Sequence, residues 1–325
     1  MDYRSIIKEV GRGAEGAADL TQETSCEVFD AMLNGHIPDL EMGALLIAFR
    51  IKGESAEEML GFYRALQQYV CRLQSPDERY RPVVIPSYNG ARRNANLTPL
   101  LALLLARLGL KVLVHGVSQD PTRVTSAEVF TELGVPHAMS GSQAQAALDK
   151  DGMAFMPVAA LSPELERLLA LRWRLGLRSS AHTLAKLVDP FDGKGLRLIS
   201  VSHPGYMDKM ANFFRDTCSH ALLLRGTEGE VYANPRRRPQ MEYLLNGERI
   251  VLLEAEKGTV TALPELPIAS DAATTAHWTR QALAGEIAVP TPILEQAACC
   301  LYACGQCSSL DDALRKLGLP STNSC

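Results

Sequence analysis

The chain has 325 residues, of which 46% are hydrophobic and 22% charged, and its formal net charge is −4. This length and composition favour a folded protein of more than one domain and argue against a disordered or low-complexity chain. The amino-terminal segment has no apolar stretch of signal-peptide length, and Arg107 and Lys111 interrupt the longest apolar region, so we expect a cytoplasmic protein without a membrane span.

The first 75 or so residues have helical patterns throughout. Gly35 and Gly53 end two amphipathic stretches, and Ser55 to Glu58 has the spacing of a capping box that opens a third helix. We therefore expect a helical domain over residues 1–76, joined by helices from about 160–188, and an α/β domain over residues 77–325.

From Pro82 onward, short β-branched runs alternate with helical patterns, which indicates parallel strands joined by crossover helices. Asn246-Gly247 joins two later runs as a hairpin, so we expect a mostly parallel central sheet with an antiparallel end. The predicted strands are Pro82–Ile85, Lys111–His115, Ala154–Val158, Leu196–Val201, Ala221–Arg225, Met241–Leu245 and Arg249–Leu253, and the predicted helices between them include Leu97–Leu108, Thr125–Leu133 and Pro204–Phe214.

Eight cysteines do not form a disulfide scaffold in a chain of this length, although four of them lie close together near the carboxyl end. Cys300, Cys304 and Cys307 have the i, i+4, i+7 spacing of one helix face, so a metal site is conceivable. The surroundings are apolar, and no histidine or paired CxxC completes a ligand set, so we favour core packing and expect no metal or cofactor.

The stretch IPSYNGARRNANL connects the first predicted strand to the next helix, a place where many α/β proteins bind phosphate. The functional interpretation is that its polar side chains and single glycine donate hydrogen bonds to phosphate; the alternative is a solvated turn. The residues concerned are Asn89, Gly90, Arg92, Arg93 and Asn94.

A second candidate, HGVSQDPTR, follows the next predicted strand at the carboxyl edge, where open α/β sheets bind their ligands. His115 and Gly116 begin this stretch, and Arg123 can reach an anion there. An ordinary strand-end histidine followed by a turn explains the same residues equally well.

Basic residues concentrate between Arg172 and Arg238, a segment that contains twelve lysines and arginines but only six acidic residues, so its net charge is +6. Trp173 lies between two arginines and offers a ring that can stack on a base, although a solvated helix face is the competing interpretation. Glu228 and Glu230 are a weak candidate for Mg²⁺ because no third oxygen ligand accompanies them. The cationic candidates for binding phosphates are Arg172, Arg174, Arg178, Lys186, Arg236, Arg237 and Arg238.

Several long stretches, among them IPSYNGAR, VHGVSQDPTRV, RWRLGLRSSAHTLAKL and TEGEVYANP, resemble the YbiB-like branch of the anthranilate phosphoribosyltransferase superfamily along almost the whole chain. The resemblance implies a small helical domain that forms a homodimer, a larger transferase-like α/β domain, and sequence-nonspecific binding of DNA and RNA.

The chain departs from true transferases at the motifs that their chemistry needs. Their glycine-rich G-T-G-G-D loop corresponds to IPSYNGARRN here, and of their K-H-G-N-R-S stretch only His115 and Gly116 remain, while a later lysine falls on Arg123. Their acidic magnesium-binding pair falls in the register of Val231 and Tyr232, neither of which has a carboxylate.

We therefore predict a nucleic-acid-binding protein, for single- or double-stranded DNA and RNA, with no catalytic residues and with arginines around a former substrate cleft. The cleft residues are Asn89, Gly90, Asn94, His115 and Gly116, with Arg92, Arg93 and Arg123 beside them. The alternative is a phosphoribosyltransferase or nucleoside phosphorylase-like enzyme with an unidentified acceptor.

Overall fold

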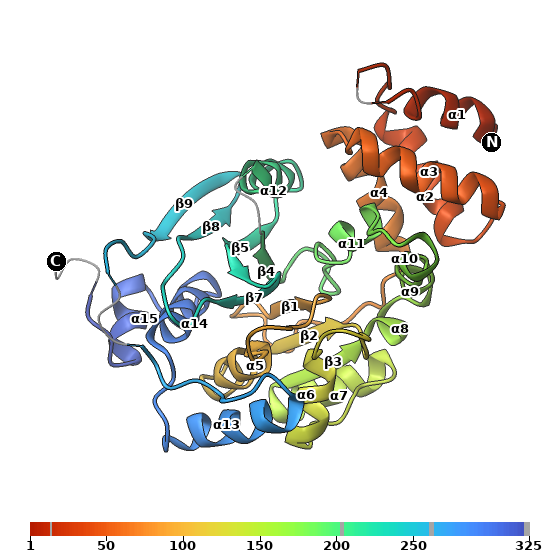
Figure 1. Cartoon of the computed structure of the whole chain (residues 1–325). Helices are drawn as coiled ribbons and strands as arrows, with labels where there is room; N and C mark the ends of the chain where they lie inside the picture. The colour runs from red at the N-terminus through yellow and green to blue at the C-terminus, as the bar shows by residue number, and fades with distance from the viewer. Residues whose placement is uncertain (14, 202–204, 260–262, 322–325) are drawn as a thin grey trace. The chain divides into compact units, whose positions relative to one another are not determined.

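A computed structural model describes residues 1–325 except 14, 202–204, 260–262 and 322–325. The chain divides into two compact units (Figure 1). A helical unit contains Met1–Cys71 and Leu161–Val188, and an α/β unit contains Arg72–Ala160 and Asp189–Cys325.

The helical unit is built around aromatic packing between its first helices. Phe29 stacks on Phe62 with ring centroids 4.9 Å apart, and Phe49 meets Phe62 edge-on at 5.0 Å. Gly61 lets its helix lie close to the helix that begins at Gln22, since a Cβ at Gly61 would lie 2.3 Å from the carbonyl oxygen of Gln22. The helices are α1 (Tyr3–Val10), α2 (Gln22–Leu33), α3 (Asp39–Lys52), α4 (Ala56–Leu66), the short 3-10 helix η1 (Gln67–Tyr69), α9 (Pro163–Ala170), α10 (Arg172–Leu175) and α11 (Ser180–Leu184).

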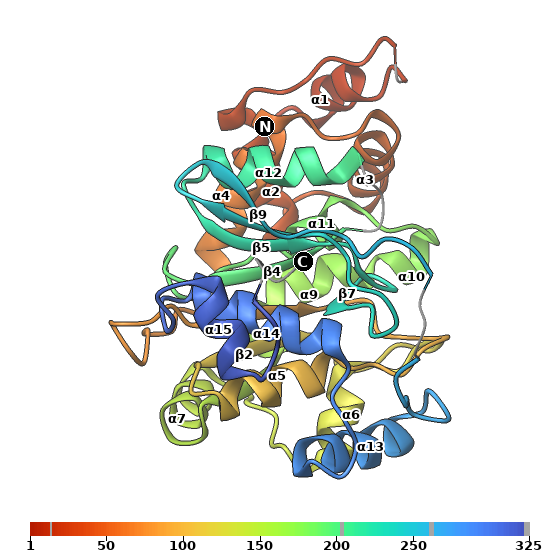
Figure 2. The same cartoon turned by 90° about the vertical axis from the view of Figure 1, so that its left-hand side faces the viewer.

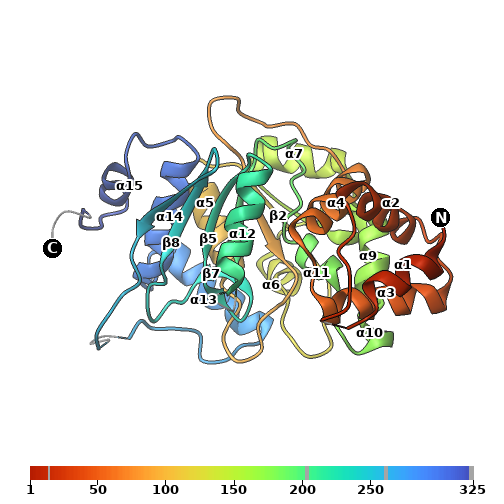
Figure 3. The ribbon, with the colours of Figure 1, turned by 90° about the horizontal axis from the view of Figure 1, so that it is seen from above.

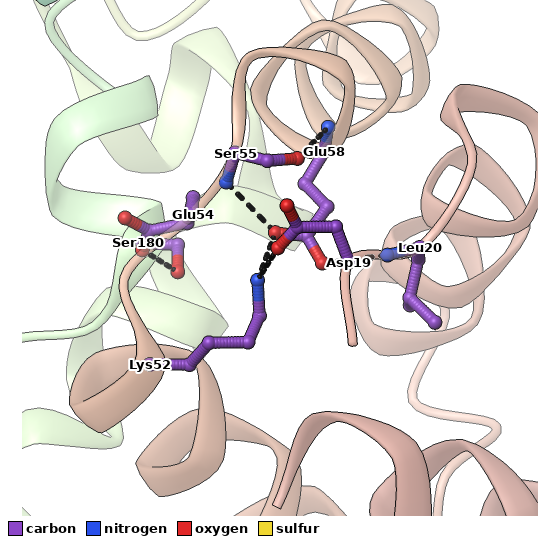
Figure 4. Close-up of polar contacts among 7 residues, drawn as sticks. All are labelled: Asp19, Leu20, Lys52, Glu54, Ser55, Glu58 and Ser180. Atoms are coloured by element: carbon purple, nitrogen blue, oxygen red, sulfur yellow. Dashed lines mark hydrogen bonds and ion pairs between the residues drawn. The ribbon is translucent and has the colours of Figure 1, made fainter. Parts of the chain in front are cut away.

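The predicted capping box at Ser55 is confirmed and forms part of a buried ionic network (Figure 4). The fully buried Glu58 carboxylate accepts the N–H of Ser55 at 2.8 Å, the N–H of Leu20 at 2.9 Å and the ammonium of Lys52 at 2.7 Å. Lys52 also contacts Asp19. Burial acts to lower the pKa of Lys52, but its bonds to Asp19 and Glu58 together raise it. The network therefore ties α3 and α4 to the segment before α2.

The α/β unit contains a seven-stranded sheet in the order β3-β2-β1-β4-β5-β8-β9. Strands β3 to β5 in this order are parallel, and β8 and β9 are antiparallel additions. A separate two-stranded hairpin consists of β6 and β7. The strands are β1 (Val83–Ser87), β2 (Val112–Gly116), β3 (Met153–Pro157), β4 (Leu196–Ser200), β5 (His220–Leu224), β6 (Gly226–Thr227), β7 (Glu230–Ala233), β8 (Met241–Leu245) and β9 (Glu248–Leu253).

Helices cover both faces of this sheet, which explains why the five parallel strands are buried along their whole length. Helices α5 and α14 lie on one side of the strands, and α12 lies on the other, along β5 and β8 (Figures 2 and 3). The helices of this unit are α5 (Thr98–Arg107), α6 (Ser126–Leu133), α7 (Gly141–Asp151), α12 (Gly205–Asp216), α13 (Ala272–Ala284), α14 (Thr291–Ala303) and α15 (Leu310–Lys316), and α8 (Val158–Leu161) leads to the helical unit.

The predicted fold class, a helical amino-terminal part followed by a mostly parallel α/β sheet, is confirmed. Each predicted strand is present with ends shifted by at most two residues, and α6 has the predicted capping box between Thr125 and Glu128. Pro204, where one predicted helix began, lies outside the described residues. Helix α7 and the β6–β7 hairpin were not predicted, since α7 has few apolar residues and the two strands are very short.

The basic stretch after Ser162 is not one continuous helix. Gly176 adopts φ 70°, a left-handed conformation that ends α10, and α11 starts only at Ser180. Arg167, Arg174 and Arg178 therefore do not share one helix face.

The cysteines near the carboxyl end pack in the core between α14 and the sheet. Burial raises the pKa values of the Cys299, Cys300 and Cys304 thiols, so they stay protonated and behave as small apolar side chains. Across the described residues, no group of three or more His, Cys, Asp or Glu side chains is placed to hold a metal ion. Nor does any helix of the described chain have the length and apolar character needed to cross a membrane.

Candidate phosphate-binding site

Three loops of the α/β unit meet at the carboxyl edge of the parallel sheet. They are residues 88–97 after β1, residues 117–125 after β2, and the β6–β7 hairpin after β5. Strands β1 and β4 are neighbours in the sheet, but the chain continues from β1 to β2 on one side and from β4 to β5 on the other. This edge therefore contains the switch point where open α/β sheets bind ligands.

The first two loops are joined by a short backbone bridge. The N–H of Ala91 donates to the carbonyl of Val124 at 2.9 Å, and the N–H of Val124 donates back to Ala91 at 2.8 Å. Gly90 adopts φ 65°, and a Cβ there would lie 2.9 Å from the Val124 carbonyl oxygen, so a side chain would be both strained and obstructed. Arg123 donates to the carbonyl of Gly90 at 3.3 Å. The structure thus brings together the two sequence stretches singled out as phosphate-binding candidates.

Glu230 anchors the start of the first loop from within the core. Its fully buried carboxylate accepts the N–H of Asn89 at 2.9 Å and the N–H of Gly90 at 2.8 Å on one oxygen. The other oxygen accepts the hydroxyl of Thr98, at the start of α5, at 3.0 Å. Glu230 therefore links the start of this loop to the start of α5 through its hydrogen bonds.

Glu228 occupies the next part of the same loop. Its carboxylate accepts the backbone N–H groups of Arg92, Arg93 and Asn94 at 2.9, 2.9 and 2.8 Å, and the Asn94 side-chain amide at 2.8 Å. Partial burial acts to raise the pKa of Glu228, but the hydrogen bonds from these donors together hold it below its ordinary value. The carboxylate is therefore ionised, and it binds the loop amides that would otherwise be available to a phosphate.

The histidine retained from the transferase pattern is buried beneath these loops. His115 is fully buried, and its Nδ1 lies 2.8 Å from the Tyr88 hydroxyl. Burial lowers the pKa of His115 to about 3, so its ring is neutral at physiological pH. Gly116 is required at the end of β2, because a Cβ there would lie 1.8 Å from the carbonyl oxygen of Ser87.

Three arginines present exposed side chains around the site. Arg92 and Arg93 are exposed while their backbone N–H groups are bound to Glu228. Arg236 is also exposed, and it donates to the Asn94 side-chain oxygen at 3.2 Å.

The remaining arginines of the triple run are held by the protein itself. Arg237 donates to the carbonyl of Gly258, and Arg238 forms an ion pair with Glu295 and donates to the carbonyl of Glu254. Arg238 is therefore mainly a structural residue.

The other predicted cationic group lies in the helical unit. The Arg172 guanidinium stacks over the Trp173 ring at 3.9 Å, and Trp173 is 55% exposed. Arg174 pairs with Asp39 at 3.1 Å, and Arg178 and Lys186 are partly exposed. These residues belong to a different compact unit from the three loops.

Sequence reasoning considered Glu228 and Glu230 as weak metal ligands and missed that both bind backbone amides. Because each carboxylate already accepts hydrogen bonds from the loop, neither forms part of an open oxygen cage. Val231 and Tyr232, in the register of the transferase acidic pair, are buried core residues, and the Tyr232 hydroxyl donates to the carbonyl of Ala95. Gly229 is the one local signal of a turn here, and it could have placed Glu228 next to a loop tip.

Comparisons with known proteins agree with this architecture. Two family models match the chain: the glycosyl transferase family helical bundle domain over residues 4–70, and the a/b domain of the same family over residues 87–318. The uncharacterized protein YbiB of Escherichia coli is 52% identical over 318 residues, covering 98% of this chain and 99% of that protein. The anthranilate phosphoribosyltransferase of Rubrobacter xylanophilus is 24% identical over 320 residues, covering 95% of this chain and 91% of that enzyme.

Solved structures show the same fold. The anthranilate phosphoribosyltransferase of Thermus thermophilus superimposes with a TM-score of 0.77 at 22% identity, covering 98% of this chain and 93% of that chain. The yeast enzyme in complex with phosphoribosyl pyrophosphate and magnesium gives 0.69 at 16% identity, covering 97% and 96%. The chain therefore belongs to this glycosyl transferase family, within the YbiB-like branch of the anthranilate phosphoribosyltransferase superfamily.

Proposed function

We propose that this protein binds DNA and RNA without sequence preference and uses the carboxyl edge of its α/β sheet to hold phosphates through arginine side chains. The observation that carries the proposal is that the backbone and the side chains of the loop after β1 have different environments. Glu228 binds the backbone amides, while the guanidinium groups of Arg92 and Arg93 remain exposed. Exposed guanidinium groups attract phosphates without reading base edges.

The transferase alternative is disfavoured by the same geometry. A transferase of this fold needs to bind the pyrophosphate of its substrate and the metal that neutralises it. Here the loop amides are occupied by Glu228, and the register of the acidic pair holds Val231 and Tyr232. Calorimetry with phosphoribosyl pyrophosphate and Mg²⁺ separates the two functions, since metal-dependent binding would favour the enzyme.

The binding experiment compares two matched pairs of exposed basic residues in the same unit. Fluorescence anisotropy with labelled single-stranded DNA, duplex DNA and RNA is measured for wild type, for Arg92→Ala with Arg93→Ala, and for Arg315→Ala with Lys316→Ala. We expect all three nucleic acids to bind wild type, and the first double variant to bind more weakly than the control. Equal affinities of the two double variants would remove this loop from the binding surface.

The cationic group in the helical unit is a second proposed binding region. Trp173, with Arg172 stacked on it, offers an exposed ring for a base and a charge for a phosphate. Changing Arg172, Arg174 and Arg178 together to alanine tests it, and unchanged affinity would confine binding to the α/β unit.

We also propose that two copies associate through the helical unit, which would join two basic surfaces in one footprint. Helix α3 carries apolar residues at Leu40, Ile47 and Ile51, a spacing that places them on one face; Leu40 is 82% exposed and Ile51 is 64% exposed. Light scattering on Leu40→Glu with Ile51→Glu tests this: we expect a dimer for wild type and a monomer for the variant. A monomeric wild type would exclude it.

A further inference from the structure

The most unusual contact in the α/β unit is a carboxylate seated where several backbone amides converge. Three consecutive N–H groups, those of Arg92, Arg93 and Asn94, point at the two oxygens of Glu228, and the Asn94 side chain adds a fourth donor. Successive N–H groups that converge in this way form an anion-binding concavity. The loop therefore has the chemistry of an anion site, and one anion is already in it.

The hairpin that carries Glu228 is shaped to deliver it. Glu228 and Gly229 occupy the turn between β6 and β7 and both adopt left-handed φ values, 52° and 88°. A left-handed conformation is strained for a residue with a side chain. Gly229 leaves room for Asn89, because a Cβ there would lie 1.6 Å from the Asn89 side-chain nitrogen. The turn thus accepts local strain at Glu228 and places its carboxylate on the amides.

Glu228 differs from its neighbour Glu230 in how firmly it is held. Glu230 is fully buried and lies at the start of β7. Glu228 is only partly buried and lies at the tip of a two-residue turn. Glu228 can therefore exchange with another anion without unpacking the core.

We propose that Glu228 is a built-in anion that keeps phosphate off the backbone amides of Arg92, Arg93 and Asn94, and so determines which phosphate compounds the site accepts. A free phosphate or a phosphate monoester must displace the Glu228 carboxylate to reach these amides. A polyanion that binds through the exposed guanidinium groups of Arg92, Arg93 and Arg236 has no such competitor. This proposal goes beyond nucleic-acid binding, because it predicts that wild type excludes free phosphate and phosphate monoesters from these amides.

A small cavity beside the loop adds to this argument. It has a volume of about 210 Å³, and its lining includes Arg93, Asn94 and Arg236 together with the apolar residues Leu97, Leu266 and Pro267. A phosphate monoester on the amides would have these two guanidinium groups and an apolar wall next to it. Removal of Glu228 would free the backbone amides of Arg93 and Asn94, two residues that also line this cavity.

The test is calorimetric titration of inorganic phosphate into wild type, Glu228→Ala and the control Glu248→Ala, whose side chain is exposed on β9. We expect Glu228→Ala to bind phosphate at least about tenfold more tightly than wild type and the control, because charge-assisted bonds become available to the ligand. Glu228→Gln, which keeps the side-chain shape, should also gain affinity if the alanine variant does not fold. Circular dichroism establishes the fold of each variant.

Two results would overturn the inference: phosphate binding by wild type as tight as by folded Glu228→Ala, or no gain in either folded variant. The same variants also separate this inference from the proposed function. Glu248→Ala, which lies outside the site, should bind DNA as wild type does. If wild type binds no nucleic acid, the proposed function fails while the phosphate titration still decides the role of Glu228.

Discussion

Replacing Glu230 with alanine should destabilise the α/β unit severely. The change removes the acceptor of three donors, the N–H groups of Asn89 and Gly90 and the hydroxyl of Thr98. Each buried donor left without a partner costs about 1 to 3 kcal/mol. Water that enters the space left by the side chain lowers the total, so we expect a loss of roughly 3 to 6 kcal/mol in the free energy of unfolding. This is a large share of the stability of an ordinary domain.

Urea unfolding followed by tryptophan fluorescence is the appropriate assay. Trp278 is 4% exposed in the α/β unit, so its emission reports the unfolding of that unit, whereas Trp173 is already exposed. Glu248→Ala, on the surface of β9, is the matched control and should stay within about 0.5 kcal/mol of wild type. If Glu230→Ala also stays within that range, the buried carboxylate does not hold the loop and the account of the site is wrong.

Arg92→Ala with Arg93→Ala should leave the urea midpoint of unfolding unchanged, since both side chains are exposed. The slope of log DNA affinity against log salt concentration should become shallower by up to about 2, because two phosphate contacts are lost, and an unchanged slope would contradict this. Burial lowers the pKa of His115 to about 3, whereas the pKa of a histidine in the unfolded chain is about 6.5. The unfolded state therefore binds a proton first as the pH falls below about 6.5, and the free energy of unfolding decreases by up to about 1.4 kcal/mol per pH unit until the pH reaches about 3. His115→Gln should flatten this dependence in urea titrations at several pH values, and an equally steep dependence in the variant would refute the assignment. Lys52→Met should lower stability by about 3 to 5 kcal/mol in thermal unfolding, because the buried Glu58 carboxylate loses its cationic partner. A variant as stable as wild type would show that the ion pair does not stabilise the helical unit.

The elements that the sequence predicted well are those with strong local patterns. Strands β1 to β5 are apolar runs buried on both faces, and the capping boxes at Ser55 and Thr125 are short-range signals that need no knowledge of the rest of the fold. The long basic stretch after Ser162 was harder to predict, because it breaks twice. Gly176 ends α10, but no glycine or proline marks the earlier break between α9 and α10 at Leu171.

The site was only partly predictable for a different reason. The position of the loops after β1 and β2 follows from the topology of an open sheet. The contacts of Glu228 and Glu230 with the β1 loop join residues more than 130 positions apart, and no local spacing encodes them. The charge count was also an imperfect guide, since Arg197 is fully buried and Arg238 is paired with Glu295. Positive charge in the sequence therefore overstated positive charge on the surface.

The salt dependence of DNA affinity decides whether guanidinium side chains hold phosphates at a site whose backbone amides are already bound by Glu228 and Glu230. We predict a linear fall of log affinity with log salt between about 50 and 200 mM, with the same slope for single strands of unrelated sequence. Binding that does not change with salt, or no binding at the lowest salt, would contradict it.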